Sequence, residues 1–94
     1  MRDLISYDEM LENKDKLKTI FLDFKARYYA LGKKQNGKFK TSDLDRLIRE
    51  TIAELKGKEK LIAEGFLEFV LGFLFNSSWD STKAFNSVDK MFNW

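Results

Sequence analysis

The sequence predicts an all-α fold, a compact bundle of four helices, or five if a short N-terminal helix stands apart. Proline is absent and only 5 of the 94 residues are glycine, which favours helices over turn-rich β structure. Apolar residues recur at helical steps through most of the chain. Residues 61–75, LIAEGFLEFVLGFLF, are apolar on nearly every face, as in a helix surrounded by other helices. We expect one domain spanning residues 1–94.

The N-terminal third is expected to form a short helix followed by a long one. Ser6 and Glu9 have the spacing of a capping box, which predicts a turn of helix over 7–12. A longer helix is predicted over 14–31, with Gly32 as its stop. Its apolar face alternates steps of four and three and consists of Leu17, Phe21, Phe24, Tyr28 and Leu31.

Three further helices are predicted from similar signals. Ser42 is expected to cap a second helix that ends at Gly57. The central helix follows at 61–75, and a last helix over about 79–92 completes the bundle. Phe69 is expected to lie in the core, where Phe69→Ala would cost about 3–5 kcal/mol.

Two glycines of the central helix suggest a close contact. Gly65 and Gly72 are seven residues apart and therefore share one face of a helix. Because glycine costs about 1 kcal/mol in a helix interior, the pair predicts a place where another backbone approaches. That backbone belongs either to another helix of this chain or to a second copy, so the pair is a candidate homodimer seam.

The residue types present argue against catalysis. The chain has no histidine and no cysteine, which removes the commonest general base, thiol nucleophiles, thiolate metal sites and disulfides. Glu64 and Glu68 lie one helical turn apart, but di-iron bundles also need a Glu-x-x-His element. We therefore expect no enzyme, no cofactor and no metal, with these carboxylates forming a polar stripe on the central helix.

The location is expected to be cytoplasmic, without a membrane partner. The N-terminus carries Arg2, Asp3 and Asp8 where a signal peptide would need an apolar run. The apolar segment 61–75 is shorter than the roughly 20 residues that cross a bilayer. The absence of cysteine fits a reducing compartment.

Charge is concentrated in a lysine-rich connector. Residues 32–41, GKKQNGKFKT, contain four lysines and no acid, while the whole chain has a net charge of only +2. Such a loop could contact an acidic protein surface. It could instead contact phosphates, with Phe39 stacking on a base, although the loop has no arginine for bidentate base readout. The candidate binding residues are Lys33, Lys34, Lys38 and Lys40, with Arg27 nearby.

In the segment 24–48, Phe24, Tyr28 and Leu31 lead into Gly32, Gly37 follows five residues later, and Phe39 comes two residues after that. This spacing resembles an EF-hand helix–loop–helix, in which Gly37 would be the central glycine and Phe39 the apolar residue that pairs with a second loop. The resemblance implies a twelve-residue loop. The first, third and fifth positions of that loop are Gly32, Lys34 and Asn36, so it also implies that calcium is not bound. Two amphipathic helices joined by a glycine turn would give the same pattern.

The C-terminal third is rich in aromatic residues. Most of these rings are needed for the core of so small a bundle. A surplus exposed as one patch would mark a protein interface, and the candidates are Trp79, Phe92 and Trp94.

These observations favour binding over catalysis. We expect a small regulator or inhibitor that occupies the surface of a protein partner, by analogy with proteins that phages and mobile elements encode. One alternative is a nucleic-acid-binding accessory protein acting through residues 32–41. Another is a structural or assembly subunit that functions by oligomerisation.

Overall fold

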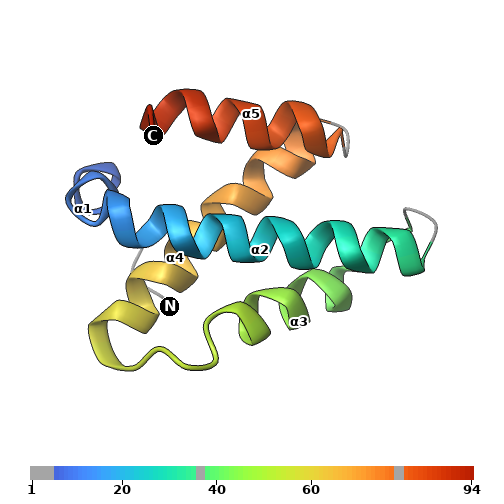
Figure 1. Cartoon of the computed structure of the whole chain (residues 1–94), viewed down its shortest axis with the longest axis horizontal. Coiled ribbons are helices and arrows are strands. Elements are labelled where there is room, and N and C mark those ends of the chain that lie inside the picture. Colours follow the sequence, from blue (N-terminus) through green and yellow to red (C-terminus); the bar gives the residue numbers. More distant parts are fainter. Residues whose placement is uncertain (1–5, 36–37, 78–79) are drawn as a thin grey trace.

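The structure is a computed structural model that describes residues 6–35, 38–77 and 80–94. These residues form five helices and no strand, which confirms the predicted all-α bundle with a separate short first helix (Figure 1). The helices are α1 (Tyr7–Glu12), α2 (Lys14–Lys34), α3 (Thr41–Thr51), α4 (Gly57–Asn76) and α5 (Ser81–Phe92).

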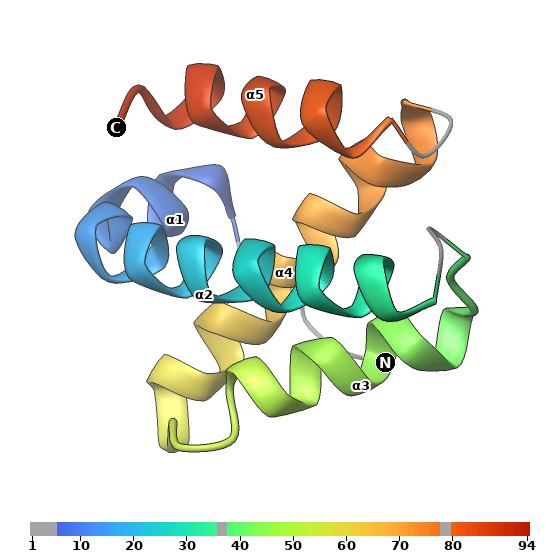
Figure 2. The same cartoon turned by 45° about the vertical axis from the view of Figure 1, so that its right-hand side comes forward.

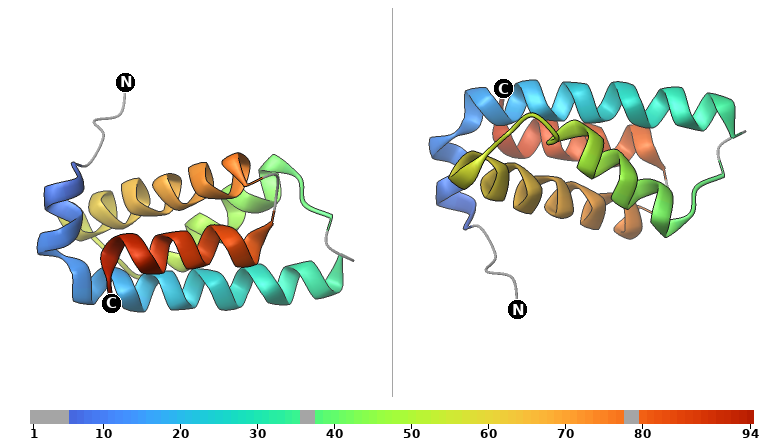
Figure 3. Two further views of the ribbon diagram at one scale, coloured as in Figure 1. Left: turned by 90° about the horizontal axis from the view of Figure 1, so that it is seen from above. Right: turned by 90° about the horizontal axis from the view of Figure 1, so that it is seen from below.

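The two long helices, α2 and α4, lie on opposite sides of the bundle (Figure 3). Helix α5 covers them from above and α3 from below, as Figure 2 also shows. Helix α1 packs at one end, against α2 and α4. The predicted central helix corresponds to α4, which contacts α1, α2 and α5.

The core is built from hydrocarbon and aromatic rings. No polar or charged side chain is buried in the described part of the chain. Phe85 of α5 meets Phe21 and Tyr28 of α2 edge to face, with ring centroids 5.6 and 5.4 Å apart. Phe66 of α4 meets Phe21 at 6.2 Å. Because edge-to-face pairs are a favoured aromatic geometry, these rings join α2, α4 and α5 in one cluster.

Phe69 is not part of the innermost core, so the prediction that placed it there is wrong. Its side chain is half-buried and packs against the core cluster, whereas Phe66, three residues earlier, is fully buried. The inward face of α4 is formed by Ile62, Ala63, Phe66, Leu67, Val70 and Leu74. Phe69 lies at the edge of that face, where it contacts Phe73 at 5.1 Å between ring centroids.

Gly32 does not end the long N-terminal helix, because α2 continues to Lys34. The ring of Phe39 lies against Gly32, and a Cβ added there would sit 3.3 Å from the Phe39 Cζ atom. The glycine therefore provides room for a ring instead of a helix stop. The next helix starts at Thr41 with Lys40 as its N-cap, two residues before the predicted cap Ser42. The Asp43 carboxylate accepts a hydrogen bond from the Lys40 backbone N–H at 2.9 Å.

Gly57 begins a helix instead of ending one. Helix α3 ends at Thr51, and Gly57 has a φ of +59°, a left-handed conformation that glycine adopts without steric cost. It turns the chain into α4, which therefore starts four residues earlier than the predicted 61. The last helix starts at Ser81, after Asp80, whose carboxylate accepts a hydrogen bond from the Lys83 backbone N–H at 3.1 Å.

Candidate interaction surface

The predicted lysines lie at the end of the molecule where α2 passes into α3. Lys33 and Lys34 belong to the last turn of α2, and Lys38 and Lys40 to the connection that follows. All four side chains are exposed. Within the described residues none of them forms a salt bridge. We call these four residues the basic end.

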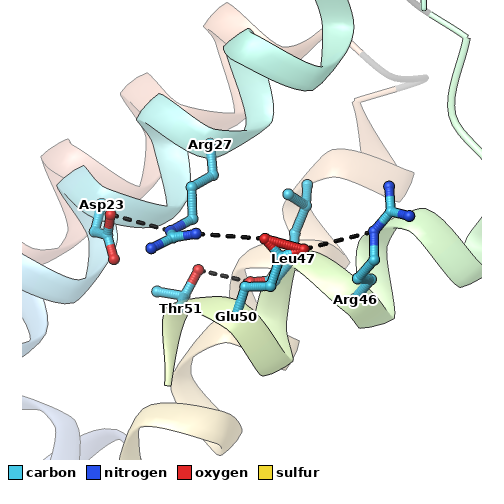
Figure 4. Close-up of polar contacts among 6 residues, drawn as sticks. All are labelled: Asp23, Arg27, Arg46, Leu47, Glu50 and Thr51. Atoms are coloured by element: carbon cyan, nitrogen blue, oxygen red, sulfur yellow. Dashed lines mark hydrogen bonds and ion pairs between the residues drawn. The ribbon is translucent and has the colours of Figure 1, made fainter. Parts of the chain in front are cut away.

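Arg27 differs from the lysines because carboxylates compensate its charge. Its Nε donates to Asp23 Oδ1 at 3.2 Å, and its Nη1 donates to Glu50 Oε2 of α3 at 3.4 Å (Figure 4). Arg46 approaches the other oxygen of Glu50 at 3.6 Å. Arg27 therefore links α2 to α3, and it adds less positive potential to the surface than sequence reasoning assumed.

The Phe39 ring is partly buried. One of its faces stacks on Tyr28, with ring centroids 4.4 Å apart and ring planes 11° apart. Burial raises the pKa of the Tyr28 hydroxyl above its usual value, and the neighbouring Tyr29 adds to the shift. Phe39 is thus a structural contact of α2, which weakens its predicted role of stacking on a nucleobase.

The connection between α2 and α3 is not an EF-hand loop. Helix α2 continues through Gly32 and Lys34, so only residues 35–40 separate the two helices. Gln35 Nε2 donates to the Lys38 carbonyl at 2.7 Å and to Asp43 Oδ2 at 3.1 Å, which ties the connection to α3. The pKa of Asp43 lies below its usual value because the Lys40 N–H, and then Gln35, donate to its carboxylate. Asn36 and Gly37 lie outside the described residues.

The side of α2 next to α5 holds a pattern that sequence reasoning missed. We call Lys18, Leu22, Lys25, Tyr29 and Lys33 the outer stripe. They recur at steps of three and four, offset from the buried positions. Leu22 is 52% exposed and Tyr29 is 41% exposed. Their spacing of three and four residues is the signal in the sequence that indicates them, as it does for the buried face.

Of the three aromatic residues predicted to bind a partner, Phe92 belongs to the core. It is 1% exposed, so its predicted role at the surface is wrong, because α5 turns this side chain toward the rings of α4. Trp94 is half-buried; it stacks on Phe92 at 4.7 Å between ring centroids, and its Nε1 donates to Asp89 Oδ1 at 2.8 Å. Trp79 lies outside the described residues.

Gly65 and Gly72 of α4 are both partly exposed. At Gly72 an added Cβ would meet no described atom within 4 Å, so the predicted close approach of another helix of this chain is wrong at this position. The other half of the prediction, a seam with a second copy of the chain, stays a prediction for Gly65 and Gly72.

A pocket of about 290 Å³ lies between α2 and the start of α4. Its apolar lining comes from Leu17, Ile20, Leu55 and Ile62. Lys16 and Glu59 also line it and form an exposed salt bridge of 2.8 Å. With one carboxylate already paired and aliphatic walls, the pocket can hold an apolar group but offers no pair of groups for acid–base chemistry.

Comparisons with known protein families, with characterised proteins and with solved structures find no match for this chain. Among the described helices, none is long and apolar enough to cross a membrane. Within the same residues, no group of three or more acidic side chains is placed to hold a metal ion.

Proposed function

We propose that this chain is a small non-catalytic binding protein, a regulator or inhibitor that occupies an acidic surface of a protein partner. The observation that carries the proposal is the basic end. Lys33, Lys34, Lys38 and Lys40 are exposed, and in the described structure no carboxylate pairs with them. Positive charge gathered at one end raises the association rate with a partner of opposite charge.

Three cations elsewhere in the chain differ from the basic end. Arg27, Arg46 and Lys16 each have a carboxylate within 4.0 Å, so their charges are partly balanced inside the molecule. The stacking of Phe39 on Tyr28 and the absence of arginine from residues 32–41 favour a protein partner over nucleic acid.

The test is charge reversal at the basic end with a matched control. One variant carries Lys33→Glu, Lys34→Glu, Lys38→Glu and Lys40→Glu. The control carries the same change in net charge at four other exposed lysines, Lys56, Lys58, Lys60 and Lys83. Circular dichroism first establishes that both variants are folded.

Capture of partner proteins from a nuclease-treated lysate then shows which variants still bind. We expect the wild type and the control to retain the same acidic protein, and the basic-end variant to lose it. Equal capture by both variants would contradict a role for the basic end. Loss of all capture on nuclease treatment would favour the nucleic-acid alternative, and a discrete multimer in light scattering with no captured partner would favour the assembly alternative.

A further inference from the structure

We infer that the outer stripe of α2 is the docking surface for an acidic amphipathic helix of the partner. This inference rests on the proposed function and names the recognition element within it. Leu22 and Tyr29, at 52% and 41% exposed, are seven residues apart and so lie on one side of α2, separated by about 10 Å along its axis. Lys25 and Tyr29 contact Phe85 of α5, so the stripe runs along the side of α2 next to α5. Beyond this edge, no described helix covers α2 in Figures 1 and 3.

The stripe has a shape that suits a helix. Ala26 is exposed and lies between Leu22 and Tyr29 along the stripe. A small residue flanked by two large ones leaves a depression that an apolar side chain of a facing helix can fill. A partner with apolar residues spaced by three, four and seven positions would meet Leu22, Ala26 and Tyr29 in register.

The stripe is also partly rigid before binding. The Nζ of Lys25 lies 6.0 Å from the ring centroid of Phe21 and 5.9 Å from that of Phe85. The ring of Tyr29 meets Tyr28 and Phe85 edge to face, with both ring centroids 5.7 Å away. Side chains that are already held in place lose less conformational entropy on binding.

Charge identifies the partner as acidic. Helix α2 carries seven basic and two acidic side chains, a net charge of +5, in a chain whose net charge is +2. One of the two acids, Asp23, is engaged by Arg27 on the side of α2 that faces α3. Lys18, Lys25 and Lys33 flank the apolar positions of the stripe. Glutamate or aspartate beside the apolar residues of a partner helix would pair with these lysines.

A bilayer or a nucleic acid would use this surface less completely. An interfacial helix buries a broad apolar face, whereas the broad apolar face of α2 is already in the core. A phosphate backbone would pair with the lysines but would leave Leu22 without an apolar contact. A helix that is both acidic and apolar complements both kinds of residue.

The test uses a synthetic peptide as the probe. It has about 18 residues, with leucine at positions spaced by three, four and seven and glutamate beside them, which is long enough to form several helical turns. A second peptide has lysine in place of every glutamate. Each is titrated into the isotope-labelled protein and followed by amide chemical shifts, with affinity from fluorescence anisotropy. Vesicles of anionic phospholipid and a DNA duplex are titrated in parallel.

We expect the acidic peptide to shift the amides of Leu22, Ala26 and Tyr29, and the lysine peptide to leave them unchanged. Leu22→Ser should weaken the acidic peptide about tenfold or more, as truncation at an interface centre does. Leu61→Ser is the control, because Leu61 of α4 is 65% exposed and lies outside the stripe; it should leave the affinity unchanged.

Three results would overturn the inference: no shift in the stripe, equal binding of both peptides, or stripe shifts produced only by vesicles or by the duplex. This failure differs from failure of the proposed function. If the basic-end variant loses the captured protein while the acidic peptide never shifts the stripe, the proposed function stands and the docking surface is wrong. If the peptide binds the stripe but no protein is captured, the docking surface stands and the proposed function is wrong.

Discussion

The two long helices use their surfaces differently, although α2 has 21 residues and α4 has 20. Both turn an apolar face inward. The outside of α2 alternates lysines with Leu22 and Tyr29, whereas α4 carries all its charges before Phe69 and leaves Gly65 and Gly72 partly exposed. Helix α4, the more apolar of the two, therefore organises the core, whereas α2, with its patterned outer stripe, is the better candidate for recognition.

The largest expected effect comes from breaking the inner face of α4. Phe66 is fully buried and lies 6.2 Å from Phe21, 5.5 Å from Phe92 and 6.0 Å from Trp94, measured between ring centroids. We expect Phe66→Ala to lower the free energy of unfolding by about 3–5 kcal/mol, a large part of the stability of a small domain. Urea denaturation measures it. Phe69→Ala, at the half-buried edge, should cost less; a cost equal to that of Phe66→Ala would show that the edge is as well packed as the centre.

The substitution Gly72→Ala tests whether the outer face of α4 is in contact with another helix. Because an added Cβ meets no described atom within 4 Å, Gly72→Ala should stabilise the helix by about 0.5–1 kcal/mol. The contrast is Gly32→Ala, where contact with Phe39 at 3.3 Å opposes the gain. Denaturation midpoints and light scattering measure both. If Gly72→Ala instead breaks a dimer, α4 also has a recognition surface, and the contrast with α2 would no longer hold.

Tyr28 tests the inner face of α2 by its titration. Burial, together with the neighbouring Tyr29, raises its pKa above the ordinary 10.0. The folded state thus favours the neutral phenol of Tyr28. The contribution of this neutral side chain to stability is fully present below pH 10 and is lost as the pH rises through the folded-state pKa. In ultraviolet absorbance, a late phenolate step should appear above pH 10, and Tyr28→Phe should remove that step. If the late step persists in Tyr28→Phe, the assignment is wrong.

The smallest effect is expected at the start of α3. The pKa of Asp43 lies below its ordinary 3.8 because the Lys40 N–H and Gln35 donate to the carboxylate. Its contribution to stability is therefore present above pH 3.8 and is lost as the pH falls through the folded-state pKa. Asp43→Asn should lower the melting temperature at pH 6 and flatten its decline in acid. If the melting temperature of Asp43→Asn declines in acid as steeply as that of the wild type, groups other than Asp43 cause the acid sensitivity.

The inner faces of the helices could be predicted from sequence because their spacing admits one solution. Leu17, Phe21, Phe24 and Tyr28 alternate steps of four and three, and all four are buried. Glycine was ambiguous, because the same residue can end a helix, begin one or make room for a ring. Choosing among these at Gly32 requires the position of Phe39, which depends on tertiary packing.

The surface could be predicted only in part. Lysines in a connector are visible as a charge run, but whether a carboxylate reaches them depends on the neighbouring helix, as Arg27 and Glu50 show. An aromatic residue near a chain end suits a core and an interface equally well, which is why Phe92 was misassigned. The expectations about enzymatic activity, partners and cytoplasmic location stay predictions.

The pairing of helices that follow one another along the chain has a consequence for folding speed. Helix α2 packs on α3 and α4 on α5, so much of the bundle forms by closing short loops. Helical proteins dominated by such local contacts fold in microseconds to milliseconds. The chain contains no proline, so no prolyl bond has to isomerise on a timescale of seconds or longer. A ribosome adds roughly 5–20 residues per second, which is slower than folding on this timescale. Synthesis rather than folding should therefore set how soon the basic end is available to a partner.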